Sequence, residues 1–232
     1  MIPKIIHYCW FGPNKMPELA EKCIESWRKF LPDYEIRLWN EFNFDVSKNR
    51  YTKEAYENKK YAFVTDYVRL YVLYKFGGIY MDTDVEVLKN LDCFLKYPAF
   101  SGFESDGSIP TGIMASEKNG EWAKWQLSYY NDKSFILPNG SLDLTSNVIV
   151  ITNLMKGRGF KLDNTLQNFE DMIFMFPKDY FCPKDKSTIS LTENTFCIHH
   201  FAGSWMPKSS KIKKRVRFFI GEKVWNLLKI LK

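Results

Sequence analysis

Hydrophobic and polar positions along the chain follow two periods, that of a strand and that of a helix. The first apolar run, Lys4–Cys9, is short and ends at a Trp-Phe-Gly-Pro turn, which predicts a buried strand. In Pro17–Phe30 the apolar residues recur every three or four positions behind two glutamates, as in an amphipathic helix. Glu35–Trp39 alternates and predicts a second strand. The chain therefore opens as a β-α-β unit.

The middle of the chain combines a long helical pattern with an apolar strand. Lys53–Phe76 is dense in aromatic residues and stops at Gly77-Gly78, which predicts one long helix. Ile79–Met81 predicts a central strand, and Val85–Leu88 its continuation.

Later segments continue the alternation of strands and helices. They are the expected strands Ala99–Phe103 and Thr195–His200 and the expected helices Glu121–Tyr130 and Thr145–Lys156. Such alternation predicts an α/β fold with a central sheet covered by helices on both faces. In such sheets ligands bind beyond the carboxyl ends of the strands. Trp10, the acids of residues 82–84 and His200 are all expected at such ends.

Composition sets the class of protein. A chain of 232 residues with 45% hydrophobic and 17% aromatic residues supports one large core, which we assign to residues 1–207. The chain contains no run of about 18 apolar residues, and its N-terminus does not read as a signal peptide. We therefore expect a cytoplasmic protein. Five cysteines without a CxxC spacing disfavour zinc ribbons and disulfides and predict buried thiols.

Positive charge is concentrated at the end of the chain. Of the 33 basic and 27 acidic residues, residues 208–232 hold nine and one, which leaves 24 and 26 for the rest. Apolar residues recur there at helical spacing, so the segment is either a basic amphipathic helix on an anionic inner membrane surface or a terminal helix packed on the domain. Nucleic-acid binding is disfavoured, because the charge is confined to this segment and no matching motif occurs.

The strongest candidate for chemistry is the sequence Gly-Gly-Ile-Tyr-Met-Asp-Thr-Asp. Asp82 and Asp84 follow an apolar strand and flank a small Thr83. Two such carboxylates can hold Mn²⁺ or Mg²⁺ against a diphosphate, because hard cations take oxygen ligands from one or two carboxylates and substrate phosphates. Taken alone, the same pair would also suit solvated acids at a turn.

Asp66 and Arg69 are three residues apart on an almost fully apolar helical segment. They therefore share one face of a helix that is expected to be buried, where charges must be paired. The pair is either an intrahelical salt bridge or a sugar-binding pair in which Asp66 accepts from hydroxyls and Arg69 binds sugar or phosphate oxygens.

Several of these segments together resemble glycosyltransferase family 32, which includes yeast-type initiating mannosyltransferases and bacterial capsular polysaccharide transferases. The resemblance is carried by Ile2–Gly12, by Asp66-Tyr67-Val68-Arg69 and by residues 74–84 with the DXD motif, and is supported by residues 199–205. A similar segment occurs in the glucosylating domains of large clostridial toxins. The resemblance implies a GT-A fold, Rossmann-like with a mixed central sheet, a nucleotide-sugar donor, Mn²⁺ or Mg²⁺, and retention of anomeric configuration.

The resemblance also implies roles for individual residues. Trp10 would stack on the donor base, although it could equally fill the core beside Pro13. Asp66 and Arg69 would contact the transferred sugar. Tyr80 would lie near the nucleoside, although a strand tyrosine is more often packing.

Within the motif, Asp82 would touch ribose, sugar or metal, and Asp84 would ligate the metal. His200 is expected to complete the metal site, with His199 as the alternative, since strand alternation lets only one of them face the cleft. Trp205 would close over the diphosphate. In related metal-dependent transferases a lysine follows the segment that corresponds to His200–Gly203 at a fixed distance. Here Lys208 lies later in the sequence, so its phosphate role is in doubt.

The resulting hypothesis is a metal-dependent retaining glycosyltransferase in capsular or surface polysaccharide synthesis, peripheral at the inner face of the membrane. Its donor would be a nucleotide sugar, UDP-linked in preference to GDP-linked, and its acceptor a saccharide or lipid-linked glycan. Residues 104–111 and 143–147 are candidates for the acceptor side.

Two alternatives stay open. Asp82-Thr83-Asp84-Val85 also fits the nucleophile motif of haloacid-dehalogenase-type phosphatases, although that motif normally lies on the first strand and no Gly-Asp-x-x-x-Asp follows it here. A non-catalytic sugar-binding subunit would keep the same cleft.

Overall fold

The structure is a computed structural model that describes residues 1–104, 108–109, 112–185 and 188–203. Residues 1–200 form one compact unit, and residues from 201 onward belong to a second unit of which only 201–203 are described. The predicted basic helix of residues 208–232 therefore lies outside the described residues.

Helices and strands alternate along the chain, as the sequence predicts. In order they are β1 (Ile5–Cys9), α1 (Glu18–Phe30), β2 (Glu35–Trp39), a 3₁₀ turn (Val46–Lys48), α2 (Arg50–Glu57), α3 (Tyr61–Phe76), β3 (Gly78–Met81), β4 (Val85–Val87), a second 3₁₀ turn (Asp92–Phe94), β5 (Ala99–Gly102), β6 (Ile113–Ser116), α4 (Glu121–Ser128), α5 (Asn147–Gly157), β7 (Gln167–Phe169), β8 (Ile173–Phe176), α6 (Lys178–Phe181), β9 (Lys184–Asp185), β10 (Thr188–Ile189) and β11 (Cys197–His199).

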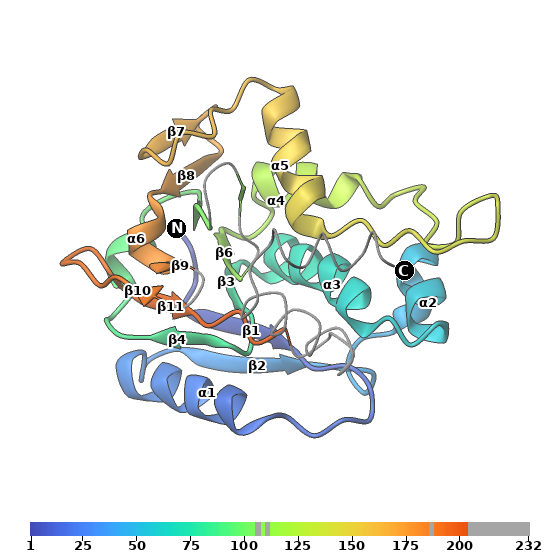
Figure 1. The fold of residues 1–232 in the computed structure, drawn as a ribbon, viewed down its shortest axis with the longest axis horizontal. Helices are drawn as coiled ribbons and strands as arrows, with labels where there is room; N and C mark the ends of the chain where they lie inside the picture. The colour runs from blue at the N-terminus through green and yellow to red at the C-terminus, as the bar shows by residue number, and fades with distance from the viewer. Residues whose placement is uncertain (105–107, 110–111, 186–187, 204–232) are drawn as a thin grey trace, which may run out of the picture. The chain divides into compact units, whose positions relative to one another are not determined.

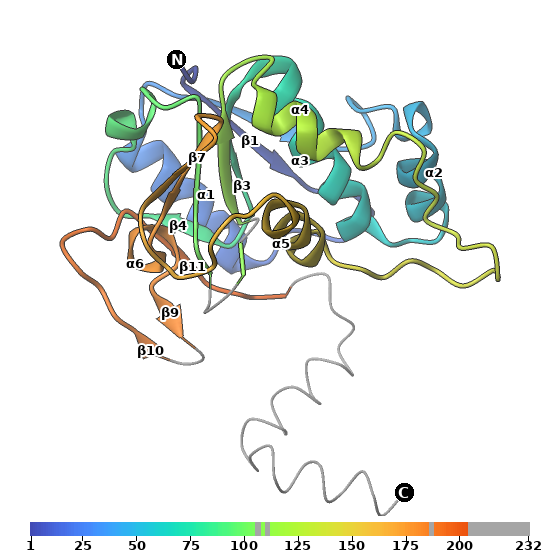
Figure 2. The ribbon, with the colours of Figure 1, turned by 90° about the horizontal axis from the view of Figure 1, so that it is seen from above.

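Seven strands build a mixed central sheet in the order β2-β1-β3-β6-β5-β8-β7. Strand β1 lies parallel to both β2 and β3, whereas β6 runs antiparallel to β3 and to β5. Helix α1 covers one face of this sheet, and α3 and α4 cover the other (Figures 1 and 2). The α/β architecture and the mixed central sheet are as predicted.

The core is divided into two clusters by the sheet. Strand β3 shows why, since successive side chains point to opposite faces. Ile79 and Met81 pack with the α1 side, whereas Tyr80 packs with the α3 side, and each is at most 1% exposed. A strand buried on both faces reads as a continuous apolar run, which is the pattern found in the sequence.

Two predicted elements differ from those observed. The single helix predicted over Lys53–Phe76 is two helices, because α2 ends at Glu57 and Lys59 adopts a left-handed backbone with φ +57°. Val85–Leu88 does not continue β3. A turn closed by the Val85 N–H and the Asp82 carbonyl (3.0 Å) redirects the chain into β4, which pairs with β11 in a separate antiparallel sheet.

Side chains of α1 hold β4 in place. The Trp27 indole N–H donates to the Val85 carbonyl at 2.7 Å, and the Ser26 hydroxyl accepts from the Val87 N–H at 2.9 Å. One edge of the short β4 is thus bound by a helix and the other by β11. The two acids of the DXD motif lie where the central sheet ends and this small sheet begins.

The junction between α3 and β3 requires glycine. Gly78 has φ +110°, and a Cβ there would lie 2.6 Å from the Ile5 carbonyl of the neighbouring strand. His7 closes the same junction, with one ring nitrogen 2.8 Å from the Gly77 carbonyl and the other accepting from the Trp39 indole at 3.0 Å. Burial lowers the pKa of His7 to about 4, so this histidine is neutral at pH 7 and Nε2 carries the proton.

Candidate active site

The DXD acids lie at the carboxyl end of β3, beside the end of the parallel strand β1. The Asp82 N–H donates to the Gly112 carbonyl at 2.8 Å, which ties the motif to the start of β6. The side chains of Asp82 and Asp84 are 26% and 17% exposed, so both reach the surface. This edge of an α/β sheet is where ligands are expected to bind.

His199 completes a potential set of metal ligands with the two acids. One ligand atom each from Asp82, Asp84 and His199 lies within 4.8 Å of the others, and His199 Nε2 is 3.4 Å from Asp84 Oδ1. Two carboxylates and one imidazole suit a divalent cation such as Mn²⁺ or Mg²⁺. The residues therefore fit the metal that the sequence predicts.

The electrostatics of His199 agree with a cation site. Burial alone would lower the pKa of His199, but the Asp84 carboxylate, the Cys182 thiol and the charge of Asp82 raise it well above its usual value. These neighbours thus favour the protonated form of the imidazole. The acids favour a positive charge at this place, and a metal ion would supply it in exchange for the proton.

The structure brings His199, and not the predicted His200, to the DXD acids, and ligation of a metal by either histidine stays a prediction. His200 Nε2 lies 2.8 Å from a carboxylate oxygen of Glu86, away from the DXD pair. The physical reason is the register of β11 on β4, which pairs His199 with Val85 and directs the His199 ring toward Asp84. Strand alternation then turns the next residue elsewhere, as the alternative in the sequence analysis foresaw.

Gly112 and Cys182 shape the surroundings of His199, and neither was predicted. A Cβ on Gly112 would lie 2.7 Å from His199 Nδ1, so the ring occupies space that only glycine leaves open. Cys182 is 2% exposed and contributes its thiol to the same ring. Their sequence contexts carry no signal for this role, because both residues reach His199 through tertiary packing. Glu86 could have been found, since it lies two residues beyond Asp84 in an alternating strand.

Asp66 and Arg69 lie beside the acids on α3, as predicted. Arg69 Nη2 is 3.4 Å from Asp66 Oδ1 and 3.3 Å from Asp82 Oδ1, and both residues of α3 are buried. One guanidinium thus links the buried carboxylate to the DXD motif. The pair is more than an intrahelical salt bridge.

Asp66 is held in an unusual ionisation state. Burial raises the pKa of Asp66 to about 7, with the charge of Asp82 adding to the effect, while Arg69 and the Asn147 N–H oppose it. Asn147 begins α5, so the segment 143–147 named for the acceptor side does reach Asp66. Asp143 in that segment is engaged by Lys133 at 2.9 Å.

Tyr80 packs against Asp82 and Arg69. It is 1% exposed, its hydroxyl donates to Asp82 Oδ1 at 2.8 Å, and Arg69 lies 4.6 Å from its ring centre. A side chain so enclosed supports the Asp82 carboxylate and favours the packing alternative. Contact with the nucleoside stays a prediction.

Trp10 directly follows β1 and is half-buried. Its indole N–H donates to the Asn14 carbonyl at 2.6 Å, so the ring lies along its own turn. Stacking on a donor base stays a prediction. Trp205 lies outside the described residues, as does part of the predicted acceptor loop 104–111.

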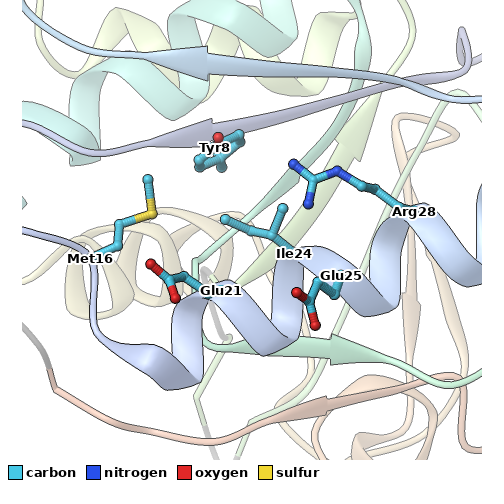
Figure 3. Close-up of a pocket in the computed structure, with 6 residues that line it drawn as sticks. All are labelled: Tyr8, Met16, Glu21, Ile24, Glu25 and Arg28. Atoms are coloured by element: carbon cyan, nitrogen blue, oxygen red, sulfur yellow. The ribbon is translucent and has the colours of Figure 1, made fainter.

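A pocket of about 300 Å³ lies between α1 and β1 (Figure 3). Its lining consists of Tyr8, Met16, Glu21, Ile24, Glu25 and Arg28. None of these is a predicted site residue. We therefore centre the candidate active site on the DXD acids.

Comparison with known sequences finds a family match over part of the chain. Residues 17–101 match the glycosyltransferase sugar-binding region containing the DXD motif. Over these residues the chain is similar to that family of glycosyltransferases. The resemblance to glycosyltransferase family 32 is thereby confirmed.

Curated relatives are themselves glycosyltransferases. The chain is 36% identical over 121 residues to inositol phosphoceramide mannosyltransferase 3 of Schizosaccharomyces pombe, which covers 50% of this chain and 34% of that protein. It is 27% identical over 221 residues to an uncharacterised glycosyltransferase of Acanthamoeba polyphaga mimivirus, covering 89% and 85%. The chain spans about a third to a half of the length of the first curated yeast relatives.

Solved structures confirm the GT-A fold. The PaToxG glycosyltransferase superposes with a TM-score of 0.50 at 19% identity, covering 68% of this chain and 69% of that chain. A glycosyltransferase involved in glycosylation of the major capsid of PBCV-1 also gives 0.50, at 12% identity, covering 87% and 95%. Among the described residues, no helix is both long and apolar enough to cross a membrane.

Proposed function

We propose that the protein is a metal-dependent glycosyltransferase that transfers a sugar from a nucleotide sugar with retention of configuration. The observation that carries this proposal is the grouping of Asp82, Asp84 and His199 within 4.8 Å beside a buried Asp66–Arg69 pair. Three metal ligands and a guanidinium at one sheet edge suit a sugar diphosphate.

A bound Mn²⁺ or Mg²⁺ would neutralise charge on the diphosphate leaving group. The residues of the chain have separate tasks around it. Arg69 Nη2 lies 3.3 Å from Asp82 Oδ1 and places a fixed positive charge beside it. The Tyr80 hydroxyl donates to the same carboxylate oxygen. We propose that Asp66 accepts a hydrogen bond from a sugar hydroxyl and takes no covalent role. These groups are set before substrate arrives, which lowers the cost of reorganisation.

For retention we propose that the acceptor attacks from the face of the leaving group and that the diphosphate takes its proton. The buried state of Asp66 supports this, because it is 6% exposed and enclosed by Arg69, which leaves it poorly placed as a nucleophile. A glycosyl adduct on a carboxylate, detected by mass spectrometry of the intact protein, would contradict this route.

The donor and acceptor are proposed by class. We propose a UDP-sugar in preference to a GDP-sugar, and a saccharide or lipid-linked glycan acceptor in surface polysaccharide synthesis. The relatives named as inositol phosphoceramide mannosyltransferases support a mannosyl donor and a lipid-linked acceptor as members of the test set.

The experiment is a panel of UDP- and GDP-sugars scored for Mn²⁺-dependent hydrolysis and transfer. We expect one donor to be turned over, and Asp84→Asn to reduce turnover at least 100-fold. Asp132→Asn, at an exposed aspartate outside the site, is the matched control and should keep full activity. Turnover that is equal in Asp84→Asn and in the wild type would contradict the proposal.

The phosphatase alternative is disfavoured, because the GT-A fold accounts for the same two acids. Hydrolysis of an aryl phosphate without nucleotide-sugar turnover would reverse this preference.

For the tail, we propose contact of residues 208–232 with an anionic inner membrane surface, which would suit a lipid-linked acceptor. Co-sedimentation with phosphatidylserine vesicles, but not with neutral ones, is the expected result, and equal sedimentation with both would contradict it.

A further inference from the structure

The turn that follows β1 faces the same edge of the sheet as the DXD motif. After β1 the chain moves to β2 on one side of it and then to β3 on the other, so the strand order reverses at β1. Ligands bind in the crevice at such a point. The Trp10 N–H still bonds to the Trp39 carbonyl at 2.9 Å, and beyond Trp10 the chain leaves the sheet.

Contacts outside the sheet fix the path of this turn at Gly12. Gly12 has φ +87°, and a Cβ there would clash with the Tyr61 ring. Its N–H donates to Glu41 Oε1 at 3.1 Å. The turn is therefore held between an aromatic ring at the start of α3 and a carboxylate just after β2.

Glu41 also binds a second element through the same oxygen. The Tyr56 hydroxyl donates to Glu41 Oε1 at 3.1 Å, and the Tyr56 and Tyr61 rings lie 5.4 Å apart at their centres. Gly12, Glu41, Tyr56 and Tyr61 thus form a closed ring of contacts, here called the Glu41 clamp. It joins the turn after β1 to α2 and to α3, the helix that carries Asp66 and Arg69.

We propose that Glu41 is a positioning residue that holds the turn of Trp10 in the conformation that receives the nucleoside of the donor. This inference rests on the proposed function and deepens it. The Glu41 clamp touches neither the DXD acids nor His199, so its loss should weaken contacts with the nucleoside and leave the metal and diphosphate contacts intact. That separation distinguishes positioning from general support of the fold.

The test compares a ligand that has a nucleoside with one that lacks it. Wild type and Glu41→Ala are titrated calorimetrically with UDP, with GDP and with pyrophosphate, each with Mn²⁺. For the nucleoside diphosphate that the wild type binds, we expect the Kd of Glu41→Ala to rise roughly 5- to 30-fold, because one half-buried acceptor for two donors is lost. The Kd for pyrophosphate should change by less than about twofold.

Three further variants sharpen the test. Glu41→Gln keeps an oxygen acceptor and should bind within about threefold of wild type. Glu57→Ala, at an exposed glutamate at the end of α2, is the matched control and should bind as wild type. Tyr56→Phe removes one of the two donors and should fall between wild type and Glu41→Ala, and it reports on the clamp even where Glu41→Ala fails to fold.

The outcomes separate the two claims. An unchanged nucleoside diphosphate Kd in Glu41→Ala and Tyr56→Phe overturns the positioning role alone. An equal loss of pyrophosphate affinity also overturns it, since the effect would then be general. A wild type that binds neither UDP nor GDP overturns the proposed function, and the positioning role with it.

Discussion

Asp66 is a buried carboxyl group whose burial disfavours its ionised form. Burial raises its pKa from an ordinary 3.8 to about 7, although Arg69 and the Asn147 N–H favour the ionised form. In the pH range between these values the folded protein holds a proton that the unfolded chain has lost. The free energy of unfolding must therefore fall as pH rises through this interval.

The first prediction concerns this pH dependence. In EDTA, the stability of the wild type relative to Asp66→Asn should fall by on the order of 2 kcal/mol between pH 5 and pH 7, because the asparagine has no proton to lose. Urea unfolding at several pH values measures the difference. Asp132→Asn serves as the control and should follow the wild type. Parallel profiles for wild type and Asp66→Asn would contradict the burial of an ionisable Asp66.

The second prediction separates the two neighbouring histidines. His199→Ala should weaken Mn²⁺ binding at least 10-fold, because it removes a ligand beside Asp84. His200→Ala should change it by less than about threefold, because His200 is paired with Glu86. Electron paramagnetic resonance of free Mn²⁺ gives both affinities. The reverse order would restore His200 as the ligand.

At this scale the sequence predicts residue types better than geometry. Arg69 contacts both Asp66 and Asp82, because residues 66 and 69 share one face of α3 and Asp82 follows β3. The choice of His199 over His200 depends on the register between β4 and β11. These two strands are paired in space but are over a hundred residues apart in the sequence. Register of that kind is a tertiary property and leaves no local signal.

At the scale of elements, a single side chain of α2 holds the segment that leads toward α5. Glu54 accepts from the Ser134 hydroxyl at 2.7 Å and from the N–H groups of Phe135 and Ile136 at 2.8 and 2.9 Å. Burial opposes its charge, but these bonds and Arg50 outweigh it and lower the pKa of Glu54 to about 2.

The third prediction follows from that lowered pKa. Glu54→Ala should reduce the free energy of unfolding by roughly 2 kcal/mol at pH 7, because the N–H groups of Phe135 and Ile136 lose a charged acceptor. The loss should shrink as pH falls from 4.5 toward 2, where the wild-type carboxylate is itself protonated. Urea denaturation measures both, with Glu57→Ala as the control. A pH-independent difference would contradict this account.

The fourth prediction concerns Gly112, which directly precedes β6 and packs against the ring of His199 in β11. Gly112→Ala places a methyl group 2.7 Å from His199 Nδ1, so the ring must move away from Asp84. We expect Mn²⁺ affinity to fall at least fivefold while the far-ultraviolet circular dichroism spectrum stays that of the wild type. Normal Mn²⁺ affinity would show that the ring does not need this position.

Element boundaries could be predicted where local chemistry sets them. Helix α1 and strand β2 have the predicted extents within one residue, because periodicity and a Pro-Asp break define them. The break between α2 and α3 was missed, since Asn58 and the two lysines after it are compatible with a helix. The chain nevertheless leaves α2 at left-handed Lys59, and the Lys60 N–H donates back to the Ala55 carbonyl at 2.8 Å. The short strands β7 to β10 lack the length needed for a periodic signal.

For the whole molecule, the fold class could be predicted because strands and helices alternate and because the DXD segment resembles a known glycosyltransferase family. The separate sheet of β4 and β11 could not. It depends on Trp27 and Ser26 of α1 binding the backbone of β4, which brings the start and the end of the compact unit together. The proposed metal ligands come from both sides of that junction.

The central claim is that one divalent cation is held by Asp82, Asp84 and His199 against the diphosphate of a sugar nucleotide. The most direct test is anomalous diffraction from crystals grown with Mn²⁺ and UDP, with GDP as the second nucleotide. The account predicts one Mn²⁺ peak within about 2.5 Å of an atom of Asp84 or His199 and of a phosphate oxygen. A peak bound by His200 and Glu86, or a nucleotide bound without metal at the acids, would contradict it.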